Sequence, residues 1–281
     1  MKNKKKNPSF LSQLTNEFRR NRSTFILFIV LRTMVILVGI RQLFLGNYEN
    51  VFLCVLTLAL FLVPAFIQKA FHVKVPSLLE KIVLIFIFAA EIMGEIGDYY
   101  VNYPLWDTML HTTTGFLAAA VGLSLIDILN KSERFRFDLS PLFVALVSFC
   151  FSMTIGVLWE FLEFSADLLL QTDMQKDTVV TSISSVLLNP AMTNTAVKIG
   201  PITETAVNGT PLIVSGYLDI GLYDTMKDMF VNFIGAVVFS IFGFFYAKYT
   251  GKNKSAHIVE GLLLRRSQKF EAENRQNNQD I

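Results

Sequence analysis

The sequence predicts an all-α fold, a polytopic membrane helix bundle of about six transmembrane helices with both termini in the cytoplasm. Hydrophobic residues make up 52% of the 281 positions, and 26 positions are Phe, which is more apolar than soluble domains usually are. Apolar runs of about 20 residues recur, and a helix of that length crosses the roughly 30 Å of hydrocarbon in a bilayer. Lys and Arg gather in alternate connections between these runs, which sets the orientation of the chain.

Six apolar runs are expected to be spans. Together they form one transmembrane domain between an N-terminal segment and a C-terminal tail. Their approximate bounds are 24–45, 49–68, 77–98, 105–129, 140–168 and 222–247. The first run is not a cleaved signal peptide, because it is too long, contains Arg32 and has no small-residue cleavage site behind it. We therefore expect a basic cytoplasmic N-terminus over 1–23, a transmembrane domain over 24–247 and a cytoplasmic tail over 248–281.

Basic residues favour a cytoplasmic N-terminus. In that orientation the inner segments hold the stretches MKNKKK and RRNR, the basic residues of the tail, and Lys69, Lys74, Lys81, Lys131, Arg134 and Arg136. The outer connections hold only Lys176 and Lys198. This one-sided distribution places both termini inside by the positive-inside rule.

Three further features concern the connections and the cysteines. The long extracytoplasmic loop, about 170–221, is poor in charge and contains many Val and Ile residues, so we expect a cover folded over the outer face. The tail SAHIVEGLLLRRSQKFEAENRQNNQD is expected to form a short surface helix that fades into disorder. Cys54 and Cys150 both fall within spans, which predicts no structural disulfide.

Two spans begin with nearly the same phrase. LWDTMLH begins at Leu105 and LYDTMKD begins at Leu222, and each carries a second polar group four residues after its Asp, namely His111 and Asp228. Asp is a favoured helix N-cap and an aromatic residue before it is typical of the membrane interface. A helix start at a membrane surface is therefore one explanation for Asp107 and Asp224, and a role in a functional site is the other.

The other acidic residues need a different explanation. Nine carboxylates, with one His and one Asn, lie at the outer ends of four spans: Glu91, Glu95, Asp98, Asp107, His111, Glu160, Glu163, Asp167, Asp224, Asp228 and Asn232. Spacings of three and four residues place each set on one helix face, which in a bundle should face neighbouring helices. Several of these acids lie at helix C-termini, where the helix dipole disfavours them, or inside the hydrocarbon, where a charge costs roughly 2.5–3.5 kcal/mol. The pattern predicts one outward-facing polar site.

Counter-charges near this site are few, which points to a bound cation or to bound protons. The sequence offers Lys227, His111 and Arg41, while carboxylate, imidazole and amide groups are ligands for Mg²⁺, Mn²⁺, Zn²⁺ or Ca²⁺. The expected metal ligands are Asp107, His111, Glu160, Asp224 and Asp228, and the expected catalytic residues are Glu160, Glu163 and His111. The remaining members expected to line the site are Glu91, Glu95, Asp98, Asp167 and Asn232.

Three stretches carry a resemblance to a known family. LWDTMLHTTTGFLAAAVG, LWEFLEFSAD and YDTMKDMFVNFIGAV, within about 77–247, resemble the YjdF-type family of uncharacterised bacterial multi-spanning membrane proteins and, more distantly, the VanZ-like membrane proteins. The family-like positions are Trp106, Asp107, His111, Gly115, Trp159, Glu160, Glu163, Asp167, Asp224, Asp228, Asn232 and Gly235. The VanZ-like pattern usually has Gln or Arg near its second motif, where this chain has Glu163, so anion binding does not carry over. The resemblance implies a multi-pass protein of the bacterial cytoplasmic (plasma) membrane. VanZ-like proteins are associated with resistance to antibiotics that act on the cell envelope, so the resemblance also implies a link to envelope lipids.

Three functions fit these observations. The first is an intramembrane, metal-dependent enzyme acting on a lipid-linked or phosphorylated envelope substrate. The second is a transporter for a cation or a proton-coupled solute, and the third is a non-catalytic membrane partner whose polar groups hold helices together. Membrane lipids are the expected surroundings, no nucleic-acid partner is expected, and the oligomeric state is open. Signature motifs of nucleotide-binding loops, zinc proteases and serine hydrolases are absent from the sequence.

Overall fold

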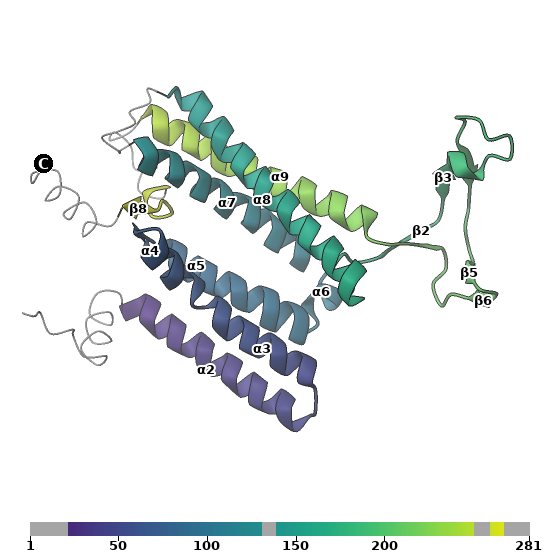
Figure 1. The fold of residues 1–281 in the computed structure, drawn as a ribbon, viewed down its shortest axis with the longest axis horizontal. Coiled ribbons are helices and arrows are strands. Elements are labelled where there is room, and N and C mark those ends of the chain that lie inside the picture. Colours follow the sequence, from purple (N-terminus) through teal and green to yellow (C-terminus); the bar gives the residue numbers. More distant parts are fainter. Residues whose placement is uncertain (1–21, 131–138, 250–258, 267–281) are drawn as a thin grey trace, which may run out of the picture.

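The computed structural model describes residues 22–130, 139–249 and 259–266, and most of these residues are helical (Figure 1). Predictions that fall on 1–21, 131–138, 250–258 and 267–281, including the basic N-terminus and most of the tail, lie outside the described residues. The main helices are α2 (Arg22–Phe44), α3 (Tyr48–Leu60), α4 (Val63–Ala70), α5 (Ser77–Phe88), α7 (Trp106–Asn130), α8 (Pro141–Leu170) and α9 (Leu222–Lys248).

Five helical segments in the described part of the chain are long and apolar enough to cross a membrane. They are Arg22–Phe44, Tyr48–Ala70, Trp106–Asn130, Pro141–Leu170 and Leu222–Lys248. The second segment contains a break, because α3 ends at Leu60 and α4 begins one residue before Pro64. Proline has no backbone N–H to continue the helical ladder, which explains the local interruption.

The expected span 77–98 is built from two kinds of helix. α5 (Ser77–Phe88) continues directly into the π-helix η1 (Ala89–Ile96). After η1, Asp98 adopts a left-handed conformation with φ 57° and precedes the short helix α6 (Tyr99–Asn102). The polar residues of this segment therefore do not follow the regular helical spacing on which the sequence prediction relied.

α7, α8 and α9 form a tightly packed unit, in which small residues bring the helix backbones together. A Cβ atom at Gly115 of α7 would collide with backbone atoms of Asn232 in α9, and one at Gly235 of α9 would collide with the carbonyl oxygen of Thr112. Ser152 of α8 donates a hydrogen bond of 2.7 Å to the carbonyl oxygen of Gly115. Such close contacts between small residues are a common means of helix association in membranes.

α2, α3 and α5 with η1 pack beside this unit (Figure 1). Their shared core consists of Leu31, Val35, Cys54, Phe61, Leu84 and Ile92. The outward faces of α2 and α3 are rich in exposed apolar side chains such as Leu37 and Phe52. Exposed apolar faces on long helices are expected where the surroundings are lipid.

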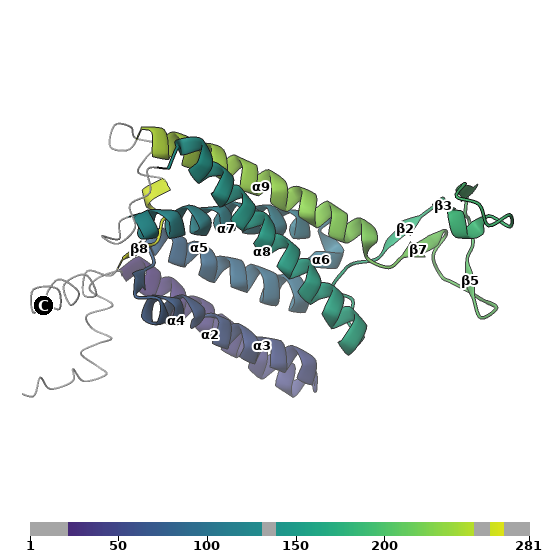
Figure 2. The ribbon, with the colours of Figure 1, turned by 45° about the horizontal axis from the view of Figure 1, so that its top comes forward.

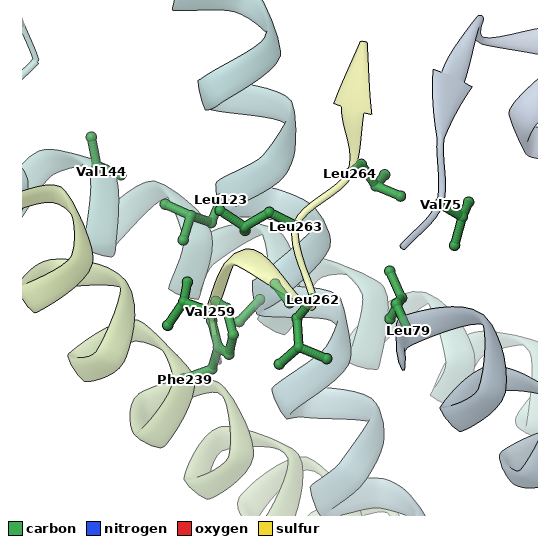
Figure 3. Close-up of a cluster of buried hydrophobic side chains, with 11 residues drawn as sticks. Val75, Leu79, Leu123, Val144, Phe239, Val259, Leu262, Leu263 and Leu264 are labelled. Carbon is green, nitrogen blue, oxygen red and sulfur yellow. The ribbon is translucent and has the colours of Figure 1, made fainter. Parts of the chain in front are cut away.

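Figure 1 shows two ends of the bundle. One, called the loop end, carries α6 and the long segment between α8 and α9, and the opposite end carries a hydrophobic cluster closed by residues 259–264. Val259, Leu262, Leu263 and Leu264 are buried there against residues of α5, α7, α8 and α9 (Figure 3). Strand β8 (Arg265–Arg266) then pairs antiparallel with β1 (Val73–Lys74).

The surface position predicted for this part of the tail was wrong, whereas Val259 and Glu260 are helical and the rest of the predicted helix lies outside the described residues. Leu262, Leu263 and Leu264 are nearly inaccessible, and the backbone N–H of Leu264 donates to Ser124 Oγ of α7 at 2.9 Å. The three consecutive leucines give no helical periodicity, and an apolar run of this kind is stabilised by insertion into a core rather than by lying on a surface.

The segment between α8 and α9 consists of short antiparallel pairs. Strand β2 (Thr178–Val180) pairs with β7 (Tyr217–Asp219), β3 (Ile183–Ser185) with β4 (Val197–Ile199), and β5 (Ala206–Val207) with β6 (Thr210–Pro211), and a 3₁₀ turn, η2 (Val186–Leu188), follows β3. In both views these pairs extend away from the helices (Figures 1 and 2). The expectation of a cover folded over the outer face was therefore wrong for these pairs. Apolar side chains of the segment, such as Leu187 and Ile213, are exposed rather than buried against the helices.

Candidate functional site

His111 of α7 lies among carboxylates from three helices. Its Nε2 atom is 3.4 Å from Asp107 Oδ1, one turn earlier on α7, and 3.5 Å from Asp228 Oδ2 on α9. Its Nδ1 atom is 3.9 Å from Glu160 Oε1 on α8. The second polar groups of the two Asp-Thr-Met phrases thus meet, together with the acid at the start of the sequence EFLEFSAD.

Three of these side chains and that of Glu163 form the first candidate cation group. His111, Glu160, Glu163 and Asp228 each offer one donor atom within 4.8 Å of all the others. Donors on one ion with bonds of about 2.1–2.5 Å can lie up to about 5 Å apart, so this spread fits a single ion. The three acids are buried, which removes the water that would otherwise solvate their charges.

Two buried oxygen atoms in this group have no hydrogen-bond partner among the described residues. They are Glu160 Oε2 and Asp228 Oδ1. Buried carboxylate oxygens are normally satisfied, because an unsatisfied one loses its hydration without compensation. By contrast, Glu163 Oε1 accepts a hydrogen bond of 2.8 Å from the indole Nε1 of Trp159.

A second acid group surrounds Lys227. Asp107, Asp224 and Asp228 offer donor atoms within 4.8 Å of one another. The Lys227 ammonium lies 3.0 Å from Asp107 Oδ2, 3.3 Å from Asp224 Oδ1 and 3.6 Å from Asp228 Oδ1. Asp228 belongs to both groups, so the two groups form one continuous site.

Packing one turn deeper in the bundle holds this site in place. Asn232 of α9 is buried, and a Cβ atom at Gly156 of α8 would lie 2.6 Å from its Nδ2. The same Nδ2 contacts Met153 Sδ at 3.6 Å, whereas Asn232 Oδ1 has no partner in the described part of the chain. Asn232 is one turn from Asp228, so the close approach of α7, α8 and α9 fixes the position of that acid.

The residues just after α8 contact the site at the loop end of the bundle. The backbone N–H of Lys176 donates to Asp224 Oδ2 at 2.9 Å, and Gln175 Nε2 donates to Thr225 Oγ1. Asp167 anchors this segment, since its carboxylate accepts hydrogen bonds from the backbone N–H of Met174 at 2.6 Å and of Gln175 at 2.8 Å.

The structure thus brings together six predicted residues and leaves others apart. Those in the two acid groups are Asp107, His111, Glu160, Glu163, Asp224 and Asp228. Glu95 and Asp98 are exposed, Glu91 is half-buried on η1, and Asp167 anchors the segment after α8. None of these four belongs to either group in the described part of the chain. Their role in lining the site stays a prediction.

Tyr100 is a residue that sequence reasoning missed. Its ring packs on Gly94 of η1, where a Cβ atom would collide with it. Burial raises the pKa of Tyr100, and the neighbouring carboxylates of Glu95 and Asp107 raise it further. The phenol therefore stays a hydrogen-bond donor near the acids. Its position after a π-helix and a left-handed residue has no regular spacing that could reveal it.

Fold and site together define an α-helical integral membrane protein with a buried acid–histidine cluster at one end of a three-helix unit. Residues 23–249 match the family described as "Predicted membrane protein (DUF2238)", and the chain belongs to this family. It is also similar to an uncharacterized protein of Thermotoga maritima, at 28% identity over 107 residues. That match covers 38% of this chain and 53% of the relative, so the chain spans about half the length of this curated relative. No solved structure matches the chain.

Proposed function

We propose that this protein binds a divalent cation at the acid–histidine cluster and uses it as an intramembrane enzyme acting on an envelope lipid or phosphorylated substrate. The observation that carries the proposal is the first cation group, His111, Glu160, Glu163 and Asp228, with donor atoms within 4.8 Å and two unpartnered buried oxygens. Polar groups buried without partners are costly in a membrane bundle, and a cation bound by one oxygen of each carboxylate would offset the buried negative charge.

Charge balance supports a cation. Asp107, Glu160, Glu163, Asp224 and Asp228 would carry five negative charges if all were ionised, against one ammonium from Lys227. Such an excess is unstable in a low dielectric. A divalent ion offsets half of the remaining four charges and leaves the His111 imidazole neutral, which is the form that binds metal. The mixed oxygen and nitrogen donor set suits Mg²⁺, Mn²⁺, Zn²⁺ or Ca²⁺.

The proposed topology has six spans, with α5 and η1 as the third, and both termini in the cytoplasm of a bacterial plasma membrane. The YjdF-type and VanZ-like resemblances agree with this placement and with an envelope substrate. Basic residues support the orientation, since Lys69 and Lys74 flank the opposite end and only Lys176 and Lys198 lie in the long loop. The site then faces outward.

Cysteine labelling tests this topology. In a Cys54→Ala, Cys150→Ser background, Thr195→Cys in the long loop should react with a membrane-impermeant maleimide in intact cells. Lys74→Cys, at the opposite end, should react only after lysis. The reverse pattern would place the site in the cytoplasm and contradict an outer-leaflet substrate.

The proposed reaction is hydrolysis assisted by the cation. A cation held by His111, Glu160, Glu163 and Asp228 would supply Lewis-acid polarisation of the phosphoryl or carbonyl oxygen of the substrate and a site for a water molecule. Glu160, whose Oε2 is unpartnered, accepts a proton as the water oxygen bonds to the substrate. The bond to the leaving group breaks, and the proton held by Glu160 passes to the leaving group, which leaves Glu160 ionised as before.

The hydrophobic cluster at the opposite end favours an enzyme over the transporter alternative. Leu123 and Phe239, on two of the helices that carry the site, are buried there with Leu262 and Leu263 (Figure 3). A transported ion needs a continuous series of polar groups along its path, whereas this cluster consists of apolar side chains and the buried Ser124 Oγ beside it accepts a hydrogen bond from the Leu264 backbone N–H. The third alternative, a partner protein held together by polar contacts, does not account for two unpartnered oxygens.

Metal analysis of the purified protein tests the proposal. Wild-type protein dialysed against Mn²⁺ should retain bound ion, and Asp228→Asn or Glu160→Gln should weaken binding at least about tenfold, because each removes a charged donor. Asp173→Asn is the matched control, since Asp173 is exposed and contacts only Lys176 among the described ion pairs. Binding that is absent in wild type, or unchanged in both site variants, would refute the cation site. Product formation from an envelope lipid extract that requires Mn²⁺ and Glu160 would establish the enzyme.

A further inference from the structure

We infer that Lys227 occupies the second position of a two-cation site, and that removing its ammonium opens this position to a second divalent ion. The inference rests on the proposed function, because the first position is the cation group of His111, Glu160, Glu163 and Asp228. It concerns the second acid group, formed by Asp107, Asp224 and Asp228.

The two groups are arranged as neighbouring cation positions with a common ligand. Donor atoms within each group lie within 4.8 Å of one another, and Asp228 is a member of both. A carboxylate has two oxygens and can therefore contact two cations. Two-metal sites hold their ions about 3.5–4 Å apart, a separation that adjacent groups sharing one carboxylate can provide.

Lys227 contacts three carboxylates, as a bound metal ion would, rather than the single carboxylate of a simple ion pair. Its Nζ atom is within 3.6 Å of a carboxylate oxygen from each of Asp107, Asp224 and Asp228. An ammonium is a compact point charge with three donors. It fills the place of an ion, yet it offers one positive charge to three carboxylates.

One oxygen in this group is left unsatisfied by the ammonium. Asp228 Oδ1 is buried and has no hydrogen-bond partner in the described part of the chain, and its 3.6 Å separation from Lys227 Nζ is too long for a hydrogen bond. A divalent ion binds carboxylate oxygens at about 2.0–2.6 Å with twice the charge. The group is thus better matched to a metal ion than to the lysine that fills it.

The second position is also accessible. The side chain of Lys227 is 43% exposed, whereas that of Asp228 is 2% exposed. Replacement of Lys227 by a neutral residue therefore leaves three carboxylates around a space that solvent ions can reach, while the first position keeps its four ligands.

Mn²⁺ stoichiometry in lipid nanodiscs tests the inference. Wild-type protein should bind one Mn²⁺ per chain, and Lys227→Met and Lys227→Ser should bind two, with a spin-coupled Mn²⁺ pair in the electron paramagnetic resonance spectrum. Lys227→Arg keeps a cation in place and should bind one. Lys176→Met is the matched control, because the Lys176 side chain pairs with Asp173 outside both groups, and it should also bind one.

Each outcome is decisive. One Mn²⁺ in wild type and in both neutral Lys227 variants overturns the inference but leaves the proposed function standing. No Mn²⁺ in wild type overturns the proposed function and, because the inference requires an occupied first position, overturns the inference as well. If both neutral variants fail to fold even when prepared with Mn²⁺, the inference also fails, because the added ion should replace the lost charge.

Discussion

His111 Nε2 lies 3.5 Å from Asp228 Oδ2, so that side chains of α7 and α9 meet at the loop end of the bundle. The contact depends on the backbones of these helices being unusually close deeper in the bundle, at Gly115, one turn from His111, and at Gly235, two turns from Asp228. The acid–histidine cluster is therefore a product of helix packing, and changes in packing should disturb it without touching a ligand.

Gly235→Ala should destabilise the protein and weaken cation binding. The added Cβ would collide with the backbone carbonyl oxygen of Thr112, which cannot move aside as a side chain could. Overpacking of this kind typically costs about 1–3 kcal/mol. Thermal unfolding in detergent and Mn²⁺ affinity measure the two effects.

Gly243→Ala, on the same helix, is the control. There the new Cβ would lie 3.4 Å from Leu123 Cδ2, which is an ordinary van der Waals distance. Since Ala also favours helix over Gly, this variant should be as stable as wild type or more so. Equal losses in both variants would show that close packing at Gly235 is not special.

The sequence was enough to predict the core of the site, and the reason is helical periodicity. Asp107 with His111 and Asp224 with Asp228 lie on regular α-helices, so four-residue spacing placed each pair on one face. Regular helical spacing did not hold over 77–98, because η1 is a π-helix and Asp98 follows it in a left-handed conformation. Helical periodicity in a sequence does not predict where the backbone becomes irregular.

Contacts between distant segments were likewise beyond sequence reasoning. The insertion of Leu263 into the opposite end, and the contact of the Lys176 backbone with Asp224, join residues far apart in the chain. Apolar or polar character alone does not say which distant partner a residue meets. The Lys227 contacts were partly foreseeable, since a lone cation among acids must find a carboxylate.

Asp167→Asn should loosen the segment that leads from α8 to the site. The carboxylate accepts from two backbone N–H groups and from Thr172 Oγ1. Charge-assisted bonds contribute about 1.5–3 kcal/mol, so amide exchange at Met174 and Gln175 should rise roughly ten- to a hundredfold. Hydrogen exchange measured by mass spectrometry reads this directly. Asp173→Asn is the control, and a similar increase there would argue against the anchoring role.

Leu263→Asn should release the segment 259–266 from the opposite end. Leu263 is 2% exposed, and loss of its buried apolar surface costs about 1.5–3 kcal/mol before the unpaired amide is counted. Trypsin should then cleave faster after Arg265 and Arg266. Leu263→Met keeps an apolar side chain of similar volume at this position and should be cleaved at nearly the wild-type rate. Cleavage that is equally slow in both variants would mean that the cluster does not hold the segment.

The central claim is that a divalent cation binds between α7, α8 and α9. An anomalous difference map at the manganese edge, from crystals grown with Mn²⁺, tests it most directly. We expect a peak bounded by His111, Glu160, Glu163 and Asp228 that is lost in Asp228→Asn. A map with no peak at these side chains, or with an equal peak in the variant, would contradict it.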